Sequence, residues 1–175
     1  MAATVYFMEY NGVAPGFGTS KEIDPIQFKS EDDPAVETIM NATAPLVRPN
    51  AGVYRSYEKY IAAYLDVLGG SADISNIEAF ISGTTPTNGI AIRYKTDAAY
   101  TEPLAGGYDA GGAMIGPTFD LFDTDSDNPV DLGAGPFNTI GANAGDYLVM
   151  QMEVRPSAET GETAGFSLVL RYDEA

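Results

Sequence analysis

The sequence predicts an all-β protein that folds as an antiparallel β-sandwich of the jelly-roll or immunoglobulin-like kind. Several short segments alternate apolar and polar residues with a period of two, as half-buried strands do. The 19 glycines and 11 prolines are spread along the chain and divide it into such segments. Strong helix signals are scarce. A hydrophobic fraction of 45% in 175 residues is sufficient for the core of a single domain spanning residues 1–175.

Six segments are predicted to be strands. The clearest is DYLVMQMEV, in which every second residue from Leu148 to Val154 is apolar and would face the core. In EIDPIQFKS, Ile26 and Phe28 alternate with polar residues in the same way. The six segments are residues 4–10, 22–30, 74–82, 89–96, 146–154 and 165–173. The polar stretch between the last two predicts a hairpin turn over 155–164.

The segment 54–68, YRSYEKYIAAYLDVL, fits two patterns. Tyr57, Tyr60, Ile61 and Tyr64 follow the spacing of an amphipathic helix. The same stretch reads as a strand, because Ile61 and other apolar residues also recur at every second position. Since the other clear elements are extended, we expect a strand here.

Residues 97–145 form a long loop-rich insertion in which Gly, Ala and Asp dominate. A structureless loop of this length is unusual inside a compact domain. The segment therefore either contains short strands, such as TFDLF at 118–122, or is a functional loop that orders against a partner. A second connection, 42–52, is rich in proline and is not expected to lie in a central strand.

Composition excludes several classes of function. With 25 acidic and 9 basic residues, the net charge of −16 disfavours nucleic acid and anionic membranes as partners. No stretch approaches the ~18 apolar residues of a membrane span, and the N-terminus lacks the pattern of a signal peptide, so we expect synthesis in the cytoplasm. The absence of Cys and His removes disulfides, thiol catalysis and the common hydrolase triads. We expect no enzymatic activity, although a two-carboxylate glycosidase remains compatible with the composition.

The sharpest local motif is DTDSDNPVD. Asp123, Asp125 and Asp127 alternate as in a calcium-binding loop, and Asp131 stands at the ninth position of that motif. The twelfth position is Ala134, so the bidentate glutamate of such loops is missing. The motif therefore indicates either a weak Ca²⁺ or Na⁺ site or a solvated acidic turn.

The sheet faces themselves predict an interface. If the Leu148 face packs inward, then Tyr147 and Val149 face outward, and Tyr60 and Tyr64 do the same on segment 54–68. Monomers rarely expose large apolar patches, so this face needs a cover. The cover is either a neighbouring subunit, with residues such as Tyr108 and Met114 joining the interface, or the 97–145 segment folded back. The two alternatives stay open.

Three blocks of the sequence resemble a known family. They are RPNAGVYRSYEKYIAAYL (48–65), ISNIEAFISG (74–83) and the terminal pair of strands within 145–174. In this order they resemble small β-sandwich virion proteins encoded among the head and tail genes of tailed phages, prophages and related archaeal viruses.

The resemblance implies a non-enzymatic structural role in a virion. A capsid decoration or stabilisation protein is the leading expectation, and a tail or baseplate component is the alternative. The implied partners are further copies of the chain, with a trimer as one form, and the major capsid protein or tail proteins. An alternative of another class is a calcium-assisted carbohydrate- or receptor-binding module.

Overall fold

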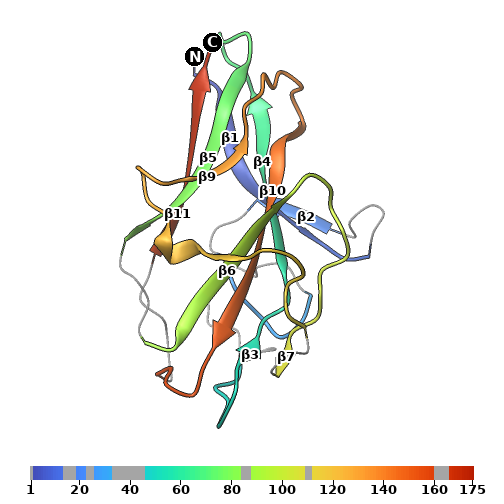
Figure 1. Ribbon diagram of the computed structural model, residues 1–175. Helices are drawn as coiled ribbons and strands as arrows, with labels where there is room; N and C mark the ends of the chain where they lie inside the picture. Colours follow the sequence, from blue (N-terminus) through green and yellow to red (C-terminus); the bar gives the residue numbers. More distant parts are fainter. Residues whose placement is uncertain are drawn as a thin grey trace.

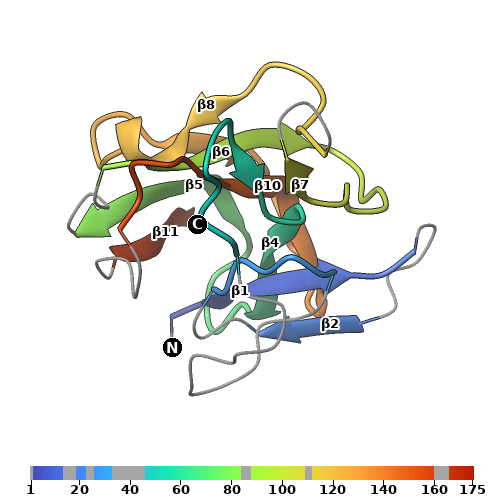
Figure 2. The same ribbon diagram turned by 90° about the horizontal axis from the view of Figure 1, so that it is seen from below.

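The computed structural model describes residues 2–13, 19–22, 26–32, 46–83, 88–108, 112–159 and 166–175. It confirms an all-β fold with two antiparallel sheets, as in a β-sandwich (Figure 1). In the described residues the only helical element is a single 3₁₀ turn, Leu121–Asp123. Viewed from below, the large sheet curves from β8 to β2 around one side of the small sheet (Figure 2).

The large sheet is built around β10, its longest strand. One edge of β10 pairs with β4 and then with β3, and the other edge pairs with β6. Beyond these, β4 pairs with β1 and β1 with β2, while β6 pairs with β8 and β3 with β7. The strands are β1 (Thr4–Asn11), β2 (Thr19–Glu22), β3 (Tyr54–Arg55), β4 (Lys59–Val67), β6 (Ile90–Asp97), β7 (Gly107–Tyr108), β8 (Phe119–Asp120) and β10 (Ala142–Val154).

The small sheet has the order β11-β5-β9, formed by Phe166–Glu174, Ile74–Gly83 and Val130–Gly133. The predicted hairpin over 155–164 is therefore wrong, because β10 and β11 lie in different sheets. Both edges of β10 are already paired, so the next strand cannot add to it. The described start of the connection turns away, with the Ala158 amide donating to the Arg155 carbonyl at 3.0 Å.

The core lies between the two sheets. Ile61, Leu65 and Leu148 from the large sheet and Ile77 and Ala79 from the small sheet are fully buried there. Burial of each large aliphatic side chain contributes about 1.5–3 kcal/mol of hydrophobic free energy. In the segment 54–68 the strand prediction is confirmed, because successive residues of β4 alternate between this core and the opposite face.

The predicted strand at 22–30 is wrong over its described part. β2 ends at Glu22, residues 23–25 lie outside the described part, and 26–32 form no ladder. Ile26 and Phe28 nevertheless pack against the core, and the Tyr57 amide donates to the Lys29 carbonyl at 3.0 Å. The apolar alternation thus reflects packing without continuous strand pairing.

β10 is longer than predicted because it continues through an irregularity at Gly145. The register with β4 shifts between Ala144 and Leu148, and Gly145 has a φ of 83°. A Cβ atom here would lie 2.2 Å from the Leu132 carbonyl oxygen, so only glycine permits this approach of β10 to β9. Short strands are present within 97–145, as the first alternative expected. The segment TFDLF is only partly a strand, because Phe119–Asp120 form β8 and Leu121–Asp123 form the 3₁₀ turn.

Candidate functional surface

The outer face of the large sheet, opposite the small sheet, gathers the most distinctive chemistry of the described residues. Along β10 it presents Tyr147, Val149, Gln151 and Glu153 in turn. These residues mark three zones that follow one another down the strand. The first zone is aromatic, the second is a buried polar network, and the third is a cluster of arginines.

A segment of the same chain crosses this face. We call residues 100–119 the strap; residues 109–111 of it lie outside the described part. The Tyr60 hydroxyl and Thr101 Oγ1 are 2.5 Å apart, and the Glu58 and Leu104 backbones are joined by an N–H···O bond of 3.1 Å. Farther along, the Met114 amide donates to Gln151 Oε1 at 3.1 Å. The strap therefore covers the outer face, which is the second of the two covers that the sequence left open.

The predicted interface residues are consequently divided. Tyr60 and Val149 are 1% and 0% exposed, and both belong with Met114 to one buried cluster. The expectation that these side chains meet another subunit is wrong, because the strap already meets them. Tyr147 is half-buried at the edge of the same cluster, and Tyr64 is half-buried beside Tyr6, with ring centroids 5.3 Å apart. Tyr108 lies elsewhere, 54% exposed and in edge contact with Tyr54.

Four tyrosine rings form the aromatic zone. Tyr60 and Tyr100 have centroids 5.0 Å apart, and Tyr10 and Tyr147 have centroids 5.4 Å apart, both in edge-to-face arrangements. The Tyr10 hydroxyl donates to Asn143 Oδ1, and Asn143 Nδ2 donates to the Tyr147 hydroxyl at 3.0 Å. Burial raises the pKa of Tyr10 to about 12 and raises the pKa values of Tyr60, Tyr100 and Tyr147 as well. These hydroxyls stay protonated at neutral pH and take part in hydrogen bonds that fix the packing, with Tyr10 donating to Asn143 and Tyr147 accepting from it.

Gln151 is the centre of the polar zone. This buried side chain donates from Nε2 to the carbonyls of Ser56 and Gly112, at 2.9 and 2.5 Å, and accepts from the Met114 amide. Nearby, Glu58 is 1% exposed and its Oε2 accepts from the Leu104 amide at 2.9 Å. Its Oε1 has no hydrogen-bond partner in the described part of the chain, and burial raises the pKa of this carboxyl.

Sequence reasoning missed a buried ion pair on the inner face. Lys59 Nζ lies 2.6 Å from Glu9 Oε1, and both side chains are almost completely buried. The Asn11 side chain also donates to Glu9 Oε1 at 3.1 Å. In the sequence each residue is in phase with core-facing neighbours, Glu9 with Phe7 and Lys59 with Ile61, but nothing in either segment indicates its partner. Only the pairing of β1 with β4 brings them together, so no local signal identifies them.

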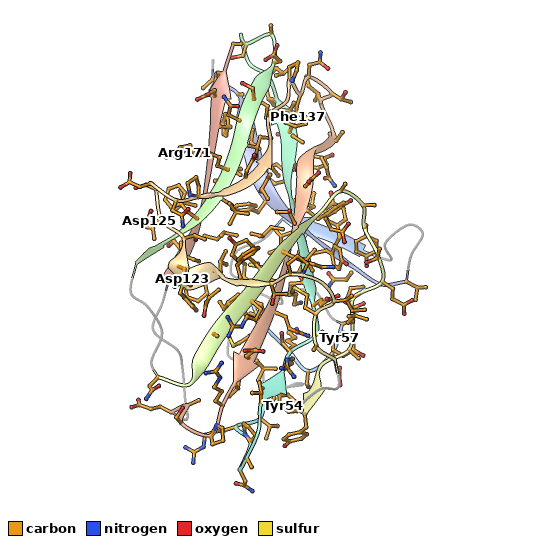
Figure 3. The ribbon with its side chains drawn as sticks, viewed as in Figure 1. Tyr54, Tyr57, Asp123, Asp125, Phe137 and Arg171 are labelled. Atoms are coloured by element: carbon orange, nitrogen blue, oxygen red, sulfur yellow. The ribbon has the colours of Figure 1, made fainter. Side chains whose placement is uncertain are left out.

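The acidic motif forms a turn closed by its own side chains (Figure 3). Asp125 Oδ1 accepts from the backbone amides of Asp127 and Asn128, at 2.8 and 2.9 Å, and Asp131 Oδ1 accepts from the Gly133 amide at 2.8 Å. Among the residues that the structure describes, no three acidic side chains, Asp123 included, come together in an arrangement that would hold a metal ion. Asp125 thus closes the turn with its own carboxylate, and the weak Ca²⁺ or Na⁺ site stays a prediction.

Large apolar side chains are exposed within the strap and at its two ends, where it leaves and re-enters the sheet. Tyr108, Ile115 and Phe119 are 54%, 71% and 60% exposed. Because β7 pairs with β3 and β8 pairs with β6, the strap crosses from one side of β10 to the other between Tyr108 and Phe119. By register, Tyr108 lies opposite Tyr54, which pairs with Val154, and Phe119 lies opposite Tyr94, which pairs with Met150. Both therefore lie on the core-facing side at the edges of the sheet, whereas Ile115 is exposed on the segment that buries Met114.

Fold and surface together define a β-sandwich whose outer face is covered by its own chain. Comparison with protein-family models, with curated proteins and with solved structures gives no match in any of the three. Across the described ranges, no helix is long and apolar enough to cross a membrane.

Proposed function

We propose that this chain is a non-enzymatic structural protein of a virus particle, and that it acts as a decoration or stabilisation protein on a capsid. The observation that carries the proposal is the exposure of large apolar side chains within the strap and at its two ends: Ile115, Tyr108 and Phe119. Large apolar and aromatic residues of this kind are enriched at protein–protein interfaces. The setting in a tailed-virus particle rests on the resemblance of the three sequence blocks.

The strap suits a docking role because it is anchored before any partner arrives. Hydrogen bonds join it to Glu58, Tyr60 and Gln151 of the sheet beneath. A surface that is already ordered loses little conformational entropy on binding. A decoration protein also gains affinity from many copies that meet a repeating lattice, so a modest apolar patch on each copy is sufficient.

The charge of the chain is compatible with this role. A net charge of −16 on the solvent side keeps a densely covered particle soluble. An acidic surface also repels nucleic acid, with which a protein on the outside of a capsid has no contact.

The test uses substitutions on the strap with a matched control elsewhere. Ile115→Asp and Phe119→Asp place a charge in the exposed patch. Ile140→Asp does the same in the loop before β10, where Ile140 is 58% exposed and lies near the end that carries the C-terminus. Circular dichroism and melting temperature establish that all variants fold.

Binding is measured by co-sedimentation with purified virus particles that lack the protein, and by size exclusion with light scattering for self-association. We expect both strap variants to lose binding and Ile140→Asp to retain it. Equal binding by all variants contradicts the proposal. Labelling of the protein in intact particles, followed by electron microscopy, separates the capsid from the tail or baseplate.

A further inference from the structure

Three arginines surround a single glutamate at the lower end of the outer face, where β3, β6 and β10 meet (Figure 1). Glu153 is largely buried. Arg55 Nε is 3.1 Å from its Oε1, and Arg93 Nε is 3.1 Å from its Oε2. Arg155 Nη2 approaches Oε2 less closely, at 3.7 Å. The only other carboxylate that pairs with these arginines in the described residues is Asp120, so three positive charges face two negative ones, a local surplus of one.

This surplus contrasts with the rest of the molecule. The net charge of the chain is −16, and elsewhere Lys59, Lys95 and Arg171 each pair with a carboxylate. Lys95 pairs with Asp97 at 3.4 Å, and Arg171 pairs with Glu78 at 2.6 Å. The arginine end is thus a locally positive site on a strongly acidic protein, and an anion that reaches it meets attraction where other surfaces repel it.

A recess of about 260 Å³ lies beside two of the arginines. Arg93, Arg155, Asp120 and the segment 88–91 line it. Arg93 uses Nε for its hydrogen bond to Glu153, and its Nη1 is 3.7 Å from Asp120 Oδ2, beyond hydrogen-bond distance. The two guanidinium groups therefore retain N–H groups that can bond a further acceptor at the recess.

We propose that this recess binds a carboxylate side chain from an acidic segment of a neighbouring polypeptide. A carboxylate carries one negative charge, which equals the local surplus, whereas the nearly doubly charged phosphate meets repulsion from Asp120 and Glu153. Guanidinium groups bind carboxylates through paired N–H···O bonds. The site is independent of the proposed role in a virion.

The binding test uses an end-capped tetraglutamate peptide as the probe, with capped tetraglutamine and inorganic phosphate for comparison. Titration calorimetry at low salt gives the affinity, and NMR shifts of the arginine Nε–H signals give the location. We expect tetraglutamate to bind, tetraglutamine not to bind, and phosphate to bind more weakly than tetraglutamate. Added salt should weaken the peptide complex, since the site is open to solvent.

Two substitutions locate the site. Arg155→Gln leaves both 3.1 Å contacts to Glu153 intact, and Arg93→Gln removes one of them. Each should weaken tetraglutamate binding about tenfold or more, the effect of losing one charge-assisted pair. Arg171→Gln is the control, because Arg171 is a similarly exposed, ion-paired arginine on the small sheet.

The proposal is overturned if tetraglutamate does not bind at low salt, if phosphate binds more tightly, or if Arg171→Gln loses as much affinity as Arg155→Gln. Arg155→Gln keeps the test valid even where Arg93→Gln fails to fold.

Discussion

Replacement of Gln151 by alanine should detach the strap from β10 and destabilise the protein by about 1.5–4.5 kcal/mol. The side chain makes hydrogen bonds to Ser56, Gly112 and Met114. A net contribution of about 0.5–1.5 kcal/mol for each of the three bonds gives this range. Domains of this size have unfolding free energies of about 5–15 kcal/mol, so we expect a folded but weakened variant.

Urea unfolding followed by circular dichroism measures the global loss, and hydrogen exchange at the Met114 amide measures the local one. In Gln151→Ala this amide loses its acceptor, so its exchange should accelerate more than that of core amides such as Leu148. Gln151→Glu keeps the shape but replaces the donor with an oxygen that faces two carbonyls, and it buries a charge. It should destabilise at least as much at neutral pH. Asn138→Ala, an exposed amide in the loop before β10, is the control.

The reasoning fails if Gln151→Ala costs less than about 1 kcal/mol while exchange at Met114 is unchanged. That result would mean that the strap is held by its tyrosine and Glu58 contacts alone. A loss equal to that of Asn138→Ala would lead to the same conclusion.

Three further predictions concern the other buried or acidic groups. Lys59→Met removes the ammonium that lies 2.6 Å from the buried Glu9 carboxylate and should cost about 3–5 kcal/mol in urea unfolding, whereas adding Glu9→Gln should recover much of the loss; an additive double variant would contradict this. Burial raises the pKa of Glu58 in the folded state, so the contribution of this carboxyl to stability is full below about pH 4.3, its pKa in the unfolded chain, and is lost as pH rises through the folded pKa. Glu58→Gln should therefore gain stability relative to the wild type as pH rises from about 4 to 7. A stability difference that does not change with pH would refute this. Millimolar Ca²⁺ should leave the melting temperature unchanged, because Asp125 already bonds the backbone of its own turn, and a rise would restore the metal hypothesis.

The sequence was sufficient to predict most strands because burial imposes a period of two. The ends of the predicted segments 74–82 and 89–96 differ from those of β5 and β6 by no more than one residue. In β4 the tyrosines also follow the spacing of a helix, so periodicity alone did not decide between the two structures. The strand prevails because Tyr60 and Ile61 are both buried, one on each face of the sheet, and a strand between two covers buries adjacent residues on opposite sides.

Strand pairing was not predictable in the same way. The last two strands look like a hairpin because a polar turn separates them, yet β11 pairs with β5 and β10 with β4 and β6. Pairing depends on which edges are already occupied, and that is a property of the whole sheet. The Lys59–Glu9 pair is hidden for the same reason, since its partners are 50 residues apart.

The cover of the outer face shows what apolar patterning leaves undetermined. Tyr147 and Val149 indicate that β10 is covered on its outer side, but a strap and a second subunit bury such residues equally well. The polar residues separate the two cases. Gln151 and Glu58 are buried and bond backbone groups of residues 104, 112 and 114, so the cover belongs to the same chain. A surface for partners must then lie away from the covered face. Ile115 is exposed on the strap, and Tyr108 and Phe119 are exposed at its two ends, so the contact that the sequence placed on the sheet is proposed instead for the strap.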